Sequence, residues 1–168
     1  MRIVVVMALL GAALSAADKP KQPLRQFGTL EVEKFENPKM ETKEPMPDSW
    51  VATIQEEIVQ RVIDKHLFPK VQDFEDPKST SKEQPAKVLV LRGKITEFTQ
   101  GSAAKRYLIG MGAGKGKIVA LVEFVDKASG EVIWTRKVDG RVIGTFQSTE
   151  GAIKGLGKEV AGVVKDNW

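Results

Sequence analysis

The chain has 168 residues, of which 42% are hydrophobic and 29% charged, with 26 basic against 22 acidic side chains. This length and composition indicate one soluble globular domain and exclude two independent domains, a disordered chain and a membrane-spanning bundle. The formal charge of +4 belongs to a mixed surface without a basic, aromatic-lined stripe, so no nucleic-acid partner is expected. Because cysteine is absent, disulfides, thiolate metal sites, a cysteine nucleophile and lipid attachment through cysteine are all excluded.

The first 17 residues have the pattern of a cleaved signal peptide. Arg2 precedes an apolar run from Ile3 to Leu14, which has no polar face and is too short to span a bilayer. Small residues at Ser15 and Ala17 suit cleavage before Asp18, and a second site lies slightly earlier. We therefore expect an exported protein, periplasmic or envelope-associated, that is not lipid-anchored through cysteine.

Residues 18–27 are polar and proline-containing at their start, and we expect them to form a flexible lead to a single domain over 28–168. Gly28 to Glu36 alternates, with Leu30 and Val32 on one side and Glu31 and Glu33 on the other. This alternation predicts a half-buried strand. The three prolines within 37–47 predict a loop.

A helix is predicted from Asp48 to Leu67, capped by Asp48 or Ser49. Its apolar positions recur at helical spacing at Val51, Ile54, Ile58 and Val62. Pro69 prevents continuation, and a short extended piece over 71–74 precedes a polar loop over 75–85.

Two strands, Val88 to Phe98 and Ile118 to Val125, are apolar on both faces, which predicts that they are central or covered on two sides, by a loop or another subunit. A turn over 127–130 predicts an antiparallel hairpin with Val132 to Val138. A further extended piece is expected over 141–146, and a glycine-rich last helix from Ser148 to Asp166. The predicted fold class is α/β (α+β): a mixed, largely antiparallel sheet of four to six strands with two main helices packed on one face.

The glycine-rich run from Gly110 to Lys117 fails as a nucleotide site. A phosphate-binding loop has four residues between its first glycine and its Gly-Lys pair, and a Ser or Thr follows that pair. Here only three residues separate Gly110 from Gly114, and Gly116 stands where the Ser or Thr should be. A dinucleotide fingerprint would lead into a helix, whereas this run leads into a strand. A strand bend or connecting loop is the simpler interpretation, and no cofactor is expected.

The sharper hypothesis treats this run as a contact surface for an acidic group on a partner or lipid, gripped by basic side chains and exposed backbone amides. The candidate binding residues are Arg106, Gly110, Gly112, Gly114, Lys115 and Lys117. No catalytic or metal residue is predicted, since His66 is the only histidine and Glu56 and Glu57 point to different sides of their helix. Asp126 is interpreted as the start of the hairpin turn.

Three stretches of the sequence resemble the pattern of a known family. They are Leu91 to Phe98, Gly101 to Gly116 and the turn from Val125 to Val132. Over about Gly28 to the C-terminus the chain is similar to the bacterial exported family called domain of unknown function 4410. The resemblance implies no established activity, and many family members look like lipoproteins, whereas this chain lacks the required cysteine. The order of elements is also similar to envelope assembly domains such as the N-terminal domain of TolB and the curli secretion lipoprotein, which is an analogy of fold.

The leading functional hypothesis is a non-enzymatic binding or assembly module that acts on an unknown envelope protein or on itself as a homo-oligomer, with peripheral membrane association as one possibility. The alternative is a carrier of a small ligand or anionic lipid in a pocket between sheet and helix. A hydrolase ranks third, because Ser, Asp and one His are present but none occupies an activating motif.

Overall fold

The computed structural model describes residues 19–38, 46–73, 87–100, 116–141 and 149–168. The predicted signal peptide, most of the glycine-rich run and all but Arg141 of the extended piece predicted over 141–146 lie outside these residues. The elements in chain order are η1 (Leu24–Gln26), β1 (Thr29–Val32), α1 (Asp48–Ile63), β2 (Lys70–Asp73), β3 (Val88–Thr99), β5 (Lys117–Asp126), β6 (Val132–Arg141) and α3 (Thr149–Asp166).

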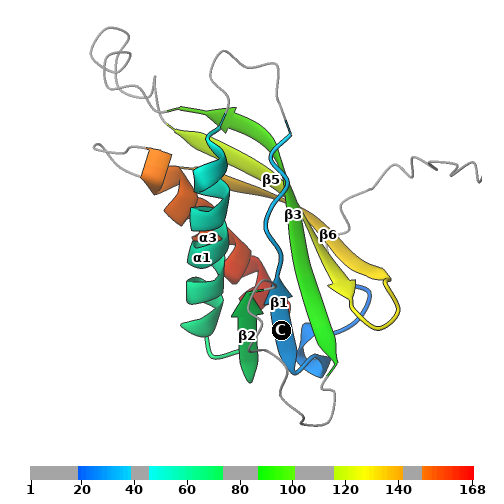
Figure 1. The fold of residues 1–168 in the computed structure, drawn as a ribbon. Helices are drawn as coiled ribbons and strands as arrows, with labels where there is room; N and C mark the ends of the chain where they lie inside the picture. Colours follow the sequence, from blue (N-terminus) through cyan, green and yellow to red (C-terminus); the bar gives the residue numbers. More distant parts are fainter. Residues whose placement is uncertain (1–18, 39–45, 74–86, 101–115, 142–148) are drawn as a thin grey trace, which may run out of the picture.

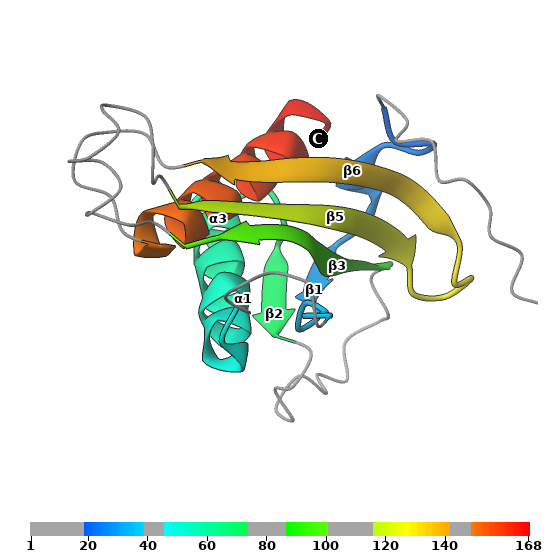
Figure 2. The same ribbon diagram turned by 90° about the horizontal axis from the view of Figure 1, so that it is seen from above.

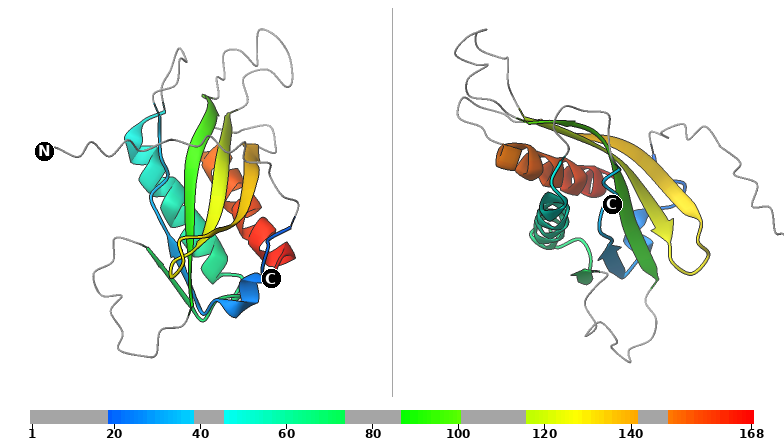
Figure 3. Two further views of the ribbon diagram at one scale, coloured as in Figure 1. Left: turned by 90° about the vertical axis from the view of Figure 1, so that its right-hand side faces the viewer. Right: turned by 45° about the horizontal axis from the view of Figure 1, so that its top comes forward.

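The strands form one mixed sheet in the order β2-β1-β3-β5-β6 (Figure 1). β1 pairs in parallel with both β2 and β3, whereas β3 with β5 and β5 with β6 make the two long antiparallel ladders. Both helices cover one face (Figures 2 and 3). The predicted α+β class, the strand number and the placement of the helices are therefore confirmed.

The core lies between this face and the helices, because alternate residues of the long strands point into it. Leu91, Phe124 and Trp134 occupy neighbouring positions across β3, β5 and β6, and the rings of Phe124 and Trp134 stack with centroids 5.2 Å apart. The predicted hairpin is confirmed as well. Asp126 starts the turn by accepting a hydrogen bond from the Ala128 N–H at 2.9 Å, and Gly130 adopts a φ of 72°.

α1 differs from its predicted bounds at both ends. Its N-cap is Pro47, and Asp48 is instead the first helical residue, with its Oδ1 accepting a hydrogen bond from Asn37 Nδ2 at 2.8 Å. The predicted side-chain cap was therefore wrong. The helix ends at Ile63 rather than Leu67, because His66 takes a left-handed backbone conformation with φ 52° that turns the chain toward β2.

α3 packs against α1 and beneath β5 and β6, through buried Leu156, Val160 and Val164. Two glycines permit these close contacts. A Cβ on Gly140 of β6 would lie 2.5 Å from the Ala152 carbonyl oxygen of α3, and a Cβ on Gly157 would lie 2.6 Å from Cγ of Glu57 on α1.

Residues 19–28 cross the sheet from its β6 edge to β1. The Lys21 N–H donates to the Ile133 carbonyl oxygen at 2.9 Å, and the Gly28 N–H donates to the Lys87 carbonyl oxygen at 3.0 Å. Leu24 and Phe27 are buried in the core between these points. The part of the predicted flexible lead that the structure describes is thus packed against the domain, an arrangement that its polar first residues do not suggest.

No helix within the described residues is long and apolar enough to cross a membrane.

Candidate functional site

Of the six predicted binding residues, only Lys117 lies within the described part of the chain. Arg106, Gly110, Gly112, Gly114 and Lys115 lie outside it. Lys117 opens β5, and its Nζ lies 2.6 Å from Glu97 Oε2. Lys137 of β6 contacts the other oxygen of the same carboxylate at 3.2 Å. Lys117 is therefore one member of a cross-strand ion cluster, here called the Glu97 cluster, in which it shares the Glu97 carboxylate with Lys137.

The sheet face opposite the helices, here called the open face, combines charged pairs with small patches of valine. Arg92 Nε lies 2.8 Å from Glu123 Oε2 across β3 and β5, and Val119 and Val125 are buried beside such pairs. The sequence predicts the apolar strip but not the ion pairs, because the paired residues are far apart in the chain. In the described residues the open face is thus not a second hydrophobic core.

A second cluster on this face joins three elements. The Glu31 carboxylate on β1 accepts hydrogen bonds from Lys127 Nζ at 2.8 and 2.7 Å and from Gln72 Nε2 of β2 at 2.7 Å. The side chain of Glu31 is only 6% exposed, whereas that of Lys127 is 49% exposed. The alternation of β1 predicts a solvent-facing Glu31, so its burial in this cluster is a finding of the tertiary structure.

The Glu97 cluster gives a testable pH dependence. Hydrogen bonds from Lys117, and then from Lys137, hold the pKa of Glu97 below its ordinary value of 4.5. A depressed carboxylate pKa contributes stability above the unfolded-state value, and this contribution is lost as the pH falls through the folded-state value. We expect Glu97→Gln to be less stable than the unmodified protein at pH 7, with a difference that begins to shrink near pH 4.5 and vanishes once the pH is below the lowered pKa of Glu97.

Urea unfolding of both proteins between pH 7 and pH 3 measures this difference. Because Lys117 makes the larger contribution to the lowered pKa, Lys117→Met should reduce the pH-dependent stability more than Lys137→Met does. Equal pH profiles for Glu97→Gln and the unmodified protein would contradict the assignment.

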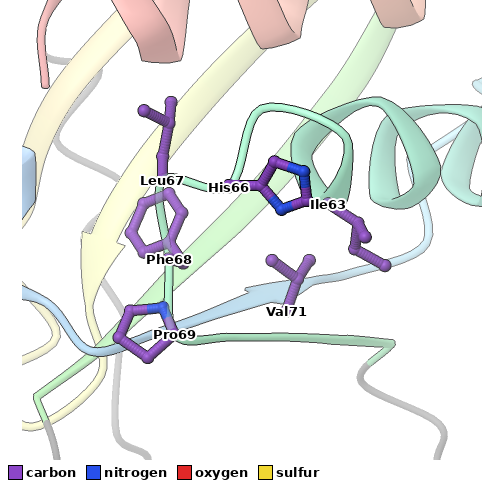
Figure 4. A pocket seen from close by; sticks show the side chains of 6 residues that line it. All are labelled: Ile63, His66, Leu67, Phe68, Pro69 and Val71. Atoms are coloured by element: carbon purple, nitrogen blue, oxygen red, sulfur yellow. The ribbon is translucent and has the colours of Figure 1, made fainter.

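His66 lies at the surface, beside a shallow hollow of about 340 Å³ between the end of α1 and β2 (Figure 4). The hollow is lined by Ile63, His66, Leu67, Phe68, Pro69 and Val71. Its lining is aliphatic and aromatic apart from His66 and contains no Lys or Arg to hold an anionic group. Among the described residues, no group of three or more His, Asp or Glu side chains is placed to hold a metal ion.

The two edges of the sheet are unequal. Among the described strands, β2 has four residues and pairs only with β1, whereas β6 has ten residues and pairs only with β5. A long edge strand presents a row of backbone N–H and C=O groups to the surroundings, a ready template for pairing with another chain. The β6 edge and the open face are therefore the surfaces of the described structure best suited to contact with another protein.

Comparison with known proteins gives a match to the family described as Domain of unknown function (DUF4410), over residues 7–167. No curated protein sequence matches the chain significantly.

Several solved structures share the fold at low sequence identity. The PelC dodecamer from Paraburkholderia phytofirmans aligns with a TM-score of 0.58 at 16% identity, covering 86% of this chain and 93% of that one. The hypothetical protein CT253 from Chlamydia trachomatis aligns at 0.54 and 13% identity, covering 84% and 97%. Protein XCC0632 from Xanthomonas campestris, of the DUF330 family, aligns at 0.53 and 9% identity, covering 90% and 88%.

Proposed function

Since the chain belongs to the family described as Domain of unknown function (DUF4410), we propose that it is a non-enzymatic binding or assembly module exported to the periplasm or envelope. The observation that carries this proposal is the combination of a long edge strand, β6, with an ion-paired open face beside it. Such surfaces suit contact with another protein, because backbone groups at the edge provide affinity and the charged pairs provide register.

The similarity of fold to PelC supports the assembly part of the proposal. That protein is described as a dodecamer, and the shared fold covers 86% of this chain. A two-layer domain with one helix-covered face and one open face is thus compatible with assembly into a larger homo-oligomer. For this chain we propose self-association or association with an envelope protein. Neither association requires the chain to insert into a membrane.

The experiment is expression of the whole chain in a Gram-negative host, followed by cell fractionation, N-terminal sequencing and native mass spectrometry. We expect a periplasmic or envelope-associated protein whose N-terminus is at or near Asp18, and a species heavier than the monomer, either with itself or with a captured envelope protein. An unprocessed chain that remains in the cytosol would overturn the proposal.

The same mass spectrum tests the alternative of a small-ligand or lipid carrier. A carrier would retain a bound lipid or metabolite after purification, as an added mass on the monomer. The hollow beside His66 is a pocket of the described residues that such a ligand could occupy, but its open lining, which contains no Lys or Arg, favours the assembly module.

A further inference from the structure

The outer edge of β6 offers its backbone groups in a defined pattern. The Glu36 N–H donates to the Gly93 carbonyl, and the Ile95 N–H donates to the Glu36 carbonyl, so odd-numbered residues of β3 in this stretch turn toward β1. The backbone groups of the even-numbered residues of β3 therefore bond to odd-numbered residues of β5. The even-numbered residues of β5 then bond to their partners on β6, which are also even-numbered. On β6 the even-numbered residues therefore bond to β5, and the odd-numbered residues point outward.

Only the start of this outer edge has a described partner. The Lys21 N–H bonds to the Ile133 carbonyl oxygen, whereas no described strand lies beside the edge from Thr135 onward. Lys137 and Asp139 alternate along this stretch and share the open face, opposite Leu121 and Val119 of β5. The edge is thus polar and charged, which protects it from unspecific pairing while leaving room for a specific partner.

We propose that this edge pairs with β6 of a second copy of the chain, antiparallel about a two-fold axis at Val138. This proposal rests on the assembly function proposed above and specifies its partner and contact. Antiparallel bonded pairs must join outward-facing residues, so odd-numbered residues face odd-numbered residues of the partner. With the axis at Val138, Lys137 faces Asp139 of the partner subunit, and Asp139 faces Lys137 of the partner subunit.

The neighbouring registers are unfavourable because they place like charges opposite each other. An axis at Lys137 sets this residue against the partner's Lys137. An axis at Asp139 sets Asp139 against the partner's Asp139. Opposite charges at facing positions stabilise a strand pair, and like charges destabilise it. Of the three registers centred at Lys137, Val138 and Asp139, only the one at Val138 therefore sets opposite charges against each other.

A second copy at this edge would also meet the helix layer. A two-fold axis perpendicular to the sheet keeps the two open faces on the same side and the two α3 helices on the other. The C-terminal part of α3 emerges beyond the outer edge of β6 (Figures 2 and 3), so this part of α3 would also contact the second copy. Lys137 and Asp139 both have polar contacts in their own protomer, and the contact with the partner adds to these.

Charge reversal tests the register directly. Lys137→Asp places two carboxylates opposite each other at both symmetric positions, and Asp139→Lys places two ammonium groups there. We expect each variant alone to raise the dimer dissociation constant about tenfold or more. An equimolar mixture of the two variants should dimerise again, because every facing pair in the heterodimer has opposite charges.

Sedimentation velocity over a concentration series measures the association, and circular dichroism verifies that each variant is folded. Lys94→Asp is the matched control, since Lys94 is a half-exposed lysine on the open face of β3, away from the edge. It should leave the dissociation constant unchanged. Thr135→Pro, which removes an outward N–H without breaking a β5 bond, should weaken the dimer.

The β6 dimer would be overturned if the wild-type chain stayed monomeric. It would also be overturned if an oligomer formed whose dissociation constant was the same for the wild type, for each charge reversal and for their mixture. The proposed function has a separate failure, an unprocessed cytosolic chain. An exported monomer that captures a different envelope protein would refute the β6 contact and leave the binding module standing.

Discussion

Replacing Gly140 with alanine is expected to lower the free energy of unfolding by about 2 to 3 kcal/mol, because the added methyl group overpacks a helix–sheet contact. Its Cβ would lie 2.5 Å from the Ala152 carbonyl oxygen and 2.7 Å from both Cβ and the backbone nitrogen of Leu156. These are mostly backbone or backbone-proximal atoms, so no side-chain rotation relieves the overlap. α3 as a whole would have to move away from β6.

The matched control is the same substitution at Gly162, on α3 itself. No heavy atom lies within 4 Å of a Cβ at this position, so the change only improves the helix propensity. We expect Gly162→Ala to raise the free energy of unfolding by up to about 1 kcal/mol. Urea unfolding of both variants at one protein concentration gives the two values, and a destabilising effect of equal size at both positions would contradict the observed packing of α3.

The second large effect is expected from Lys127→Met, which removes the cation that holds the buried Glu31 carboxylate. This carboxylate, 6% exposed, would retain the hydrogen bond from Gln72 but lose both bonds from Lys127. Removing one partner of a fully buried ion pair costs about 3 to 5 kcal/mol. Because Lys127 is half exposed, we expect a smaller loss, of about 2 kcal/mol.

The reverse substitution should cost less. Glu31→Gln leaves Lys127 without its carboxylate, but the ammonium group can turn into water, so we expect a loss of about 1 kcal/mol. A double-mutant cycle in urea gives the coupling between the two residues. If Glu31→Gln lowers the free energy of unfolding more than Lys127→Met does, then the cost of leaving a buried carboxylate without its cation is not the main effect at this pair.

The elements of the fold follow from local patterns that the sequence displays. Alternation predicts β1, helical spacing predicts α1 and α3, and the turn before Gly130 predicts the hairpin of β5 and β6. Each of these signals depends on residues a few positions apart, which lie close together in the folded and the unfolded chain alike. The ends of α1 were predicted less well, because Asp48 bonds to Asn37 and His66 turns the chain in response to neighbours outside the helix.

The candidate site was predicted only in small part. Lys117 is the sole predicted binding residue within the described part of the chain, and its partner Glu97 carried no signal in the sequence. The β6 edge was predicted as a strand, but its position at the end of the sheet follows from the strand order, which places β1 beside β3 and thereby leaves β6 outermost.

The sequence by itself therefore determined the class of fold, most of the strands and helices, and the absence of cysteine chemistry. The tertiary structure alone decided which charges meet. Glu31 and Lys127 are 96 residues apart and Lys21 and Glu131 are 110 apart, so their contacts exist only after the sheet has formed. Local propensity acts over a few residues, whereas strand order and cross-strand pairing depend on the packing of the whole domain.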